Sequence, residues 1–162
     1  MDNAVVVAVA ERLAGLGYAC LRFNFRGVGG SEGSYSGGSG EADDACAAVE
    51  YLMSLGIGRV AVVGYSFGAY AAIKAARMRG VECYVAISPP NALMPFEALS
   101  GVEKPRFAVV GSHDELADLE GLKHLFDDIA VVECADHFWW GREEEAAAHV
   151  ARFLRRAGLT PL

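Results

Sequence analysis

The segment 64–68, Gly-Tyr-Ser-Phe-Gly, matches the G-x-S-x-G pattern of a nucleophilic serine. It directly follows the apolar run 60–63 and directly precedes the alanine-rich stretch 69–76. A strand, a sharp turn and a helix in this order hold the serine hydroxyl above the edge of a sheet. The glycines two residues before and after the serine leave room where the chain comes close to itself. The pattern predicts Ser66 as the nucleophile.

A serine hydroxyl needs a base within hydrogen-bond reach, and an acid must orient that base. Among the four histidines, His137 lies in a loop after the last expected strand and late in the chain, as the order serine, acid, histidine requires. His124 and His149 lie within expected helices, where a solvated or core-edge role is the simpler interpretation. His113 directly precedes the best candidate acid. We therefore expect His137 to be the base.

The acid should follow a strand and lie between the serine and the histidine, and Asp114 meets both conditions. Asp118, one turn further on, is the reserve. Asp114 also suits a structural role as a loop or helix cap. Three other aspartates fit less well, because they lie at the opposite edge of the sheet or next to the histidine itself: Asp127, Asp128 and Asp136.

These residues predict acyl transfer to water. His137 takes the Ser66 proton as the hydroxyl attacks a carbonyl, and Asp114 holds the imidazole tautomer. The backbone N–H of Phe67 receives the oxyanion. Four residues are candidates for lining an acyl pocket, although aromatic residues after a strand more often pack in the core: Pro89, Phe138, Trp139 and Trp140.

The rest of the chain alternates short apolar runs with helical patterns. Strands are expected over residues 18–25, 59–63, 82–88, 106–111 and 129–133. Helices are expected from a cap at Asp2 or Asn3 to residues 15–17, and over about 41–53, 67–78, 119–126 and 142–156. Strands joined by helices form a parallel sheet, and the loops that follow the strands all lie at its carboxyl edge. We expect one domain over residues 1–162, a three-layer α/β/α sandwich with about five mostly parallel strands.

Composition excludes several classes of function. The net charge of −7 and the scattered 14 lysines and arginines argue against nucleic acid or an anionic membrane as partner. No apolar run approaches the roughly 20 residues of a membrane span, and no basic segment suggests a signal peptide. The cysteines have no C-x-x-C pair, so we expect buried free thiols of a cytoplasmic protein without metal or other cofactor: Cys20, Cys46, Cys83 and Cys134.

Two further patterns resemble functional motifs but have simpler explanations. The glycine-rich segment 27–33 does not have the G-x-G-x-x-G spacing of a dinucleotide site, and Glu32 would repel a pyrophosphate. Glu41, Asp43 and Asp44 cluster in the first turn of an expected helix. Carboxylates there stabilise the helix N-terminus by roughly 0.3 to 1 kcal/mol each.

Three segments resemble the α/β-hydrolase superfamily, and within it the small bacterial hydrolases related to the dienelactone hydrolase group: residues 21–33, 64–70 and 136–141. The resemblance covers nearly the whole chain. It implies Ser66, Asp114 and His137 as the triad, an esterase-like activity on a small-molecule ester, and no metal. The dienelactone hydrolases use a cysteine nucleophile, so the serine here favours a similarity to the esterases of this group.

The chain departs from that superfamily at its beginning, because members have about three strands before the first helix. The third of these lies between the strands that correspond to residues 18–25 and 60–63. Without it, we expect these two strands to lie roughly 10 Å apart, which is two strand spacings. The loop after it normally supplies the second oxyanion donor, worth on the order of 10² to 10³ in rate.

Two explanations are open. Either Met1 is an internal methionine taken as the start, which we favour because a naked parallel strand edge is a pairing hazard, or the chain closes the gap by moving a strand or borrowing one from a neighbour. A serine hydrolase of small carboxylic esters or thioesters is the first hypothesis. The alternative is a catalytically impaired domain with a structural or assembly role, such as a homodimer formed through exposed strand edges.

Overall fold

A parallel sheet of four strands forms the centre of the molecule. The computed structural model describes residues 1–161. The strands lie in chain order, each parallel to the next: β1 (Val60–Tyr65), β2 (Val81–Ile87), β3 (Arg106–Gly111) and β4 (Asp128–Val132). Strands β2 and β3 are buried almost throughout, as expected for parallel strands covered on both faces.

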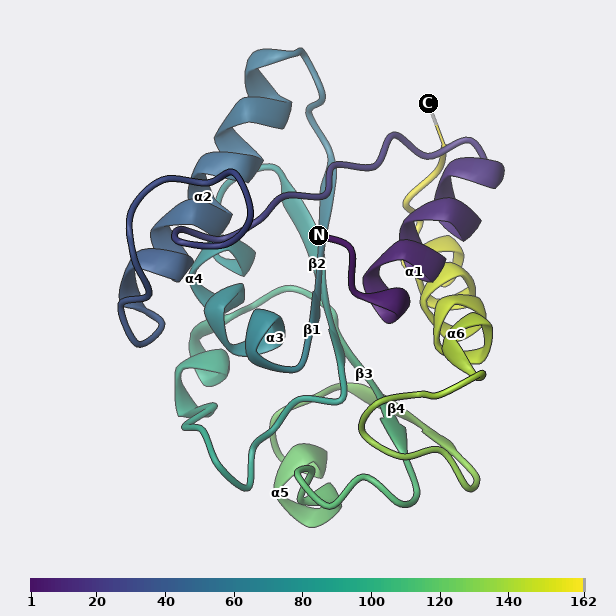
Figure 1. The fold of residues 1–162 in the computed structure, drawn as a ribbon. Coiled ribbons are helices and arrows are strands. Elements are labelled where there is room, and N and C mark those ends of the chain that lie inside the picture. The colour runs from purple at the N-terminus through teal and green to yellow at the C-terminus, as the bar shows by residue number, and fades with distance from the viewer. Residues whose placement is uncertain (162) are drawn as a thin grey trace.

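Helices cover both faces of this sheet (Figure 1). One layer consists of α1 (Ala4–Gly15) and α6 (Glu143–Arg156), which pack side by side. The other contains α2 (Ser39–Ser54), α3 (Phe67–Ala71) and α4 (Ile73–Ala76). The short helix α5 (Leu119–Lys123) and the 3-10 turn η1 (Glu97–Gly101) lie in connecting segments. The three-layer α/β/α arrangement predicted from the sequence is confirmed.

Local sequence explains the long helices. The Asn3 side chain caps α1 by accepting hydrogen bonds from the N–H groups of Val5 and Val6 at 3.0 and 3.4 Å. Helix α6 has three glutamates in its first turn and two arginines in its last, the arrangement that the helix dipole favours. Its apolar stripe is buried against the sheet and includes Val150 and Leu154.

The expected first strand is absent. Residues 18–25 form no strand, so the sheet has four strands instead of about five. An extended segment becomes a strand only when its backbone pairs with a neighbour. Here a cleft separates the segment from β1. The expected helix over residues 67–78 is also different, because it is divided at Ala72 into α3 and α4.

The cysteines agree only partly with expectation. All four are free, but only Cys83 is buried, and burial raises the pKa of its thiol to about 12. Cys20 and Cys134 are exposed, so the prediction that all four are buried is wrong. Within residues 1–161, no helix is long and apolar enough to be a membrane span, and no cluster of three or more potential ligand side chains is placed to hold a metal ion.

Candidate active site

The turn between β1 and α3 holds Ser66 in a strained conformation, with φ 52° and ψ −125°. A Cβ atom on Gly64 would lie 2.5 Å from the Cα atom of Ala69, so no other residue fits there without a shift of the backbone. A Cβ atom on Gly68 would meet nothing nearer than the Phe25 ring at 3.9 Å. The prediction that both glycines are sterically required is therefore right for Gly64 and wrong for Gly68.

The structure brings the three predicted site residues together at the carboxyl edge of the sheet. Ser66 follows β1, Asp114 follows β3, and His137 follows β4. The Ser66 Oγ atom lies 2.8 Å from His137 Nε2, and His137 Nδ1 lies 2.9 Å from Asp114 Oδ1. Both His137 and Asp114 are 7% exposed. This geometry allows one proton to pass from the serine hydroxyl to the imidazole while the carboxylate orients the ring.

The carboxylate of Asp114 is held in its charged form. Burial alone would raise its pKa, but interactions with His137 and Ser88, together with the N–H of Leu116 at 3.1 Å from Oδ1, lower the pKa below its usual value. The Oδ2 atom is buried and has no hydrogen bond of standard geometry to the residues that the structure describes. The neighbouring Ser88 hydroxyl can act as a donor to this carboxylate.

Ser88 and Trp139 form a second pair behind the carboxylate. The indole N–H of Trp139 donates to Ser88 Oγ at 2.9 Å, and both residues are 0% exposed. Because Ser88 Oγ accepts this bond, its own proton remains free for Asp114. Trp139 was expected to line an acyl pocket, and the structure corrects this, since its ring is enclosed in the core with Ile87 and Val109.

Backbone strain is concentrated in these residues. Four non-glycine residues among those described have positive φ angles. Ser66, Ser88 and Trp139 belong to this network, and Cys134 lies outside it. Such conformations cost of order 1–3 kcal/mol each and persist where the surrounding structure enforces them, often at functional sites. Ser88 was not predicted from the sequence. Its only signal is a polar residue at the end of the apolar strand β2.

Two polar side chains, those of Asp136 and Tyr65, fix the loop that carries His137. Asp136 Oδ1 accepts hydrogen bonds from the N–H groups of Phe138 and Trp139 at 3.0 and 2.9 Å. The hydroxyl of Tyr65 donates to the His137 carbonyl oxygen at 2.9 Å. Burial, with the nearby charges of Asp114 and Asp136, raises the pKa of Tyr65 to about 12, so the phenol stays protonated as a donor. The backbone is thus held at His137 and at the two residues that follow it.

The other candidate residues have structural positions. Asp118 caps α5 by accepting from the N–H groups of Glu120 and Gly121, both at 3.2 Å. Asp127 pairs with Arg106 at 2.7 Å. The remaining candidates lie outside the cluster: Asp128 is paired with Arg156, His113 and His124 are exposed, and His149 lies in α6.

The aromatic residues around Ser66 give the site an apolar rim. Phe67 is the first residue of α3, so its N–H is among those that a helix leaves without an intrahelical acceptor. The rings of Phe67 and Tyr35 lie 5.8 Å apart. The rings of His137 and Phe138 lie 5.5 Å apart, and Phe138 is 58% exposed. Pro89, expected in the pocket, is buried.

Glu41 has a more specific role than the expected helix-terminus stabilisation. Its buried carboxylate accepts from the N–H and hydroxyl groups of Ser36 at 2.9 and 2.8 Å and from the N–H of Gly38 at 2.8 Å. Burial would raise its pKa, but these hydrogen bonds lower it to about 2. Asp44 bonds to Arg26 at 2.7 Å. The two carboxylates therefore hold the loop of residues 26–38, which contains Tyr35, against α2.

The comparisons with known proteins agree with this architecture. The family model of the X-Pro dipeptidyl-peptidases (S15 family) matches residues 3–102. An uncharacterised protein of Rickettsia prowazekii is 32% identical over 171 residues, which cover 95% of this chain and 72% of that protein. An α/β serine hydrolase homologue from Coxiella burnetii is 32% identical, with a TM-score of 0.82, over 95% of this chain and 77% of that one.

Two further solved structures are similar to this chain. A serine hydrolase without a lid from Xanthomonas campestris is 30% identical, with a TM-score of 0.83, over 96% of this chain and 74% of that one. An esterase from Pyrococcus furiosus is 26% identical, with a TM-score of 0.80, over 96% of this chain and 77% of that one. These names do not single out the dienelactone hydrolases, and that finer expectation stays a prediction. The family model spans more than half of the residues, so the chain belongs to the X-Pro dipeptidyl-peptidase (S15) family of the α/β-hydrolase superfamily.

Proposed function

We propose that this protein is a serine hydrolase that cleaves small carboxylic esters or thioesters, with Ser66 as nucleophile, His137 as base and Asp114 as the orienting acid. The observation that carries the proposal is the pair of hydrogen bonds at His137, 2.8 Å to Ser66 Oγ and 2.9 Å to Asp114 Oδ1. The family assignment and the esterase among the similar structures support the same reaction class.

The reaction proceeds in two halves. In the first, Ser66 Oγ attacks the ester carbonyl carbon while its proton moves to His137 Nε2, and the N–H of Phe67 binds the oxyanion. The imidazolium then gives this proton to the departing alkoxide or thiolate, which leaves an acyl-serine. In the second, His137 takes a proton from water, the hydroxide attacks the acyl carbon, and Ser66 leaves with the proton returned by His137.

The surroundings of the serine favour a small apolar acyl group. Two aromatic pairs accompany the site residues, Phe67 with Tyr35 and Phe138 with Trp140, with ring centroids 5.8 and 6.2 Å apart within the pairs. Tyr35 and Trp140 are 68% and 76% exposed, so the rim is open to solvent. An open rim of this kind admits small esters without demanding one particular alcohol.

The family name raises a second substrate class, peptide bonds that follow proline. A dipeptidyl peptidase must bind the free ammonium group of its substrate, which calls for an uncommitted carboxylate near the nucleophile. The two carboxylates beside this site are already engaged, Asp114 by His137 and Asp136 by backbone N–H groups. We therefore place ester hydrolysis first and expect hydrolysis of glycyl-prolyl p-nitroanilide to be much slower than that of p-nitrophenyl acetate.

Labelling with a fluorophosphonate probe, read by intact mass, tests the proposal. The wild-type protein should gain one adduct, and Ser66→Ala should gain none. Ser54→Ala is the matched control, because the Ser54 hydroxyl bonds to the Tyr51 carbonyl near the exposed end of α2, at 2.7 Å, away from the site. A folded wild-type protein that does not react would overturn the proposal in favour of a structural or assembly role.

A further inference from the structure

Tyr65 links the turn that carries the nucleophile to the loop that carries the base. It is the last residue of β1 and directly precedes Ser66. Its hydroxyl donates to the carbonyl oxygen of His137 at 2.9 Å, and the centroid of its ring lies 5.8 Å from that of the imidazole. Two consecutive residues therefore hold His137 at two points, Ser66 at the imidazole Nε2 atom and Tyr65 at the backbone carbonyl.

The phenol is the anchor of the His137 backbone. Within residues 1–161, the hydroxyl of Tyr65 is the one hydrogen-bond partner of the His137 main chain, because no other backbone or side-chain group bonds to its N–H or its carbonyl oxygen. Asp136 instead holds the N–H groups of the two residues that follow the histidine. The placement of the imidazole therefore depends on this phenol in addition to Ser66 and Asp114.

The bond between Ser66 and His137 cannot last through the whole reaction. In the free protein the Ser66 hydroxyl donates its proton to Nε2, across 2.8 Å. In an acyl-serine, Oγ is an ester oxygen and has no proton. Neutral His137 keeps its own proton on Nδ1, which faces Asp114 at 2.9 Å, so Nε2 has none either. Two acceptors form no hydrogen bond, and Ser66 therefore stops holding the imidazole once it is acylated.

We propose that Tyr65 is a positioning residue that keeps His137 in place in the acyl-enzyme, after Ser66 has released the imidazole. The bond from phenol to carbonyl contains no group that gains or loses a proton in the reaction, so it persists through both halves. Nε2 then stays where it can take a proton from the attacking water, and a displacement of about 1 Å would be costly there. This role rests on the proposed hydrolysis and adds that its second half depends on Tyr65 more than its first.

The reagent p-nitrophenyl dimethylcarbamate separates the two halves. In the first, Ser66 Oγ bonds to the carbamoyl carbon, p-nitrophenolate leaves with the electron pair of the broken C–O bond, and the serine proton passes through His137 to the solvent. In the second, water attacks the same carbon with His137 as base, the bond to Oγ breaks, and Oγ regains a proton as dimethylcarbamic acid departs. Absorbance of p-nitrophenolate follows the first half. Loss of the adduct from the gel-filtered protein, read by intact mass, follows the second.

Tyr65→Phe removes the hydroxyl and keeps the ring beside the imidazole. Carbamoylation of this variant should stay within about twofold of the wild-type rate, because Ser66 still holds His137 in the free protein. Decarbamoylation should slow by about tenfold, the upper range for the loss of one neutral hydrogen bond. A change in the ratio of the two rates is a result that a uniform loss of structure would not produce.

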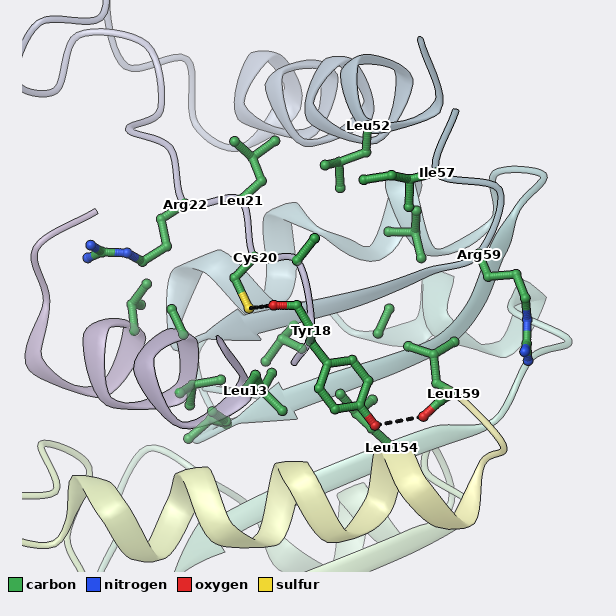
Figure 2. A pocket seen from close by; sticks show the side chains of 18 of the residues that line it. Leu13, Tyr18, Cys20, Leu21, Arg22, Leu52, Ile57, Arg59, Leu154 and Leu159 are labelled. Atoms are coloured by element: carbon green, nitrogen blue, oxygen red, sulfur yellow. Dashed lines mark hydrogen bonds between the residues drawn. The ribbon is translucent and has the colours of Figure 1, made fainter. Parts of the chain in front are cut away.

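Tyr18→Phe is the matched control, because it removes a bond of the same kind at another place. The Tyr18 hydroxyl donates to the carbonyl oxygen of Leu159 at 2.7 Å (Figure 2). Tyr18 and Tyr65 both line the cleft beside β1, but Leu159 lies beyond α6 and not in a loop that carries a site residue. Tyr18→Phe should carry out both halves at the wild-type rates. Urea unfolding of the two variants measures any loss of stability that they share.

Three results would overturn this role for Tyr65. The first is equal slowing of both halves in Tyr65→Phe, which would mean that the phenol only supports the site as a whole. The second is wild-type rates in both halves, and the third is the same imbalance in Tyr18→Phe. Failure of the proposed function would look different, because the wild-type protein would then form no carbamoyl adduct and would behave like Ser66→Ala.

Discussion

The indole N–H of Trp139 donates a 2.9 Å hydrogen bond to the hydroxyl of Ser88, and both side chains are fully buried beside Asp114. The pair extends the line of contacts from Ser66 through His137 and Asp114 into the core. Each residue of the pair has a positive φ angle, 46° for Ser88 and 59° for Trp139. The fold thus retains two strained residues in order to place one hydroxyl behind the carboxylate.

Replacing Ser88 should reduce both stability and reactivity. Ser88→Ala leaves the buried indole N–H without an acceptor, which should lower the free energy of unfolding by about 1–3 kcal/mol. Ser88→Gly also lacks the hydroxyl but relieves the positive φ, so it should be the more stable variant by roughly 1 kcal/mol. Urea unfolding measures the difference. If the hydroxyl orients Asp114, both variants should react more slowly with the fluorophosphonate, and wild-type rates in either would contradict this role.

The two glycines of the turn should respond differently to alanine. Gly64→Ala puts a Cβ atom 2.5 Å from a backbone atom, and we expect a loss of stability above about 3 kcal/mol and no labelling of Ser66. Gly68→Ala meets only an ordinary contact at 3.9 Å, and it exchanges glycine for a better helix former in α3. Its stability should be unchanged or up to about 1 kcal/mol higher. Equal effects in urea unfolding would show that this reading of the turn is wrong.

The choice between two acids is tested by a matched pair of substitutions. Asp114→Asn should reduce fluorophosphonate labelling of Ser66 by about 10³ to 10⁴-fold, because an amide does not hold the imidazole in the productive tautomer. Asp118→Asn should label at the wild-type rate, since asparagine caps a helix about as well as aspartate. A larger loss in the Asp118 variant would instead identify Asp118 as the acid.

Glu41 should make stability depend on pH in the acid range. Its pKa in the folded protein, about 2, lies below the ordinary value of 4.5 for a glutamate. A depressed pKa means that the carboxylate stabilises the fold above the ordinary pKa, and that this contribution fades as the pH falls from about 5 toward 2. Thermal unfolding of Glu41→Gln should therefore occur well below the wild-type temperature at pH 7, and the gap should narrow at pH 3. A gap of constant size would refute the assignment.

The sequence predicted the site residues where a chemical motif and the order of strands and helices indicated the same place. That Ser66, Asp114 and His137 lie close together could be predicted, because the turn motif fixes one residue and the alternation of strands and helices brings the loops to one edge. Ser88 and Trp139 could not, because a serine ending a strand and a tryptophan following one are ordinary residues until their contact is known. Their roles depend on one hydrogen bond between residues far apart in the chain.

Residues 18–25 illustrate the other limit. Their apolar pattern is that of a strand, but the chain there forms none. Strand formation, however, depends on a neighbour at hydrogen-bonding distance, and no local pattern reports whether one is present. The steric role of Gly68 could not be predicted either, because the motif is the same whether or not its second glycine is sterically needed.

Ser66 and His137 follow β1 and β4, the two border strands of the sheet. The hydrogen bond between them therefore joins groups anchored at opposite ends of the ladder, and its length depends on the twist and spacing of every strand in between. A local opening at either border should separate the pair before the core is exposed. On heating, the reactivity of Ser66 should accordingly be lost before the cooperative unfolding transition. This loss would report local opening of the border strands.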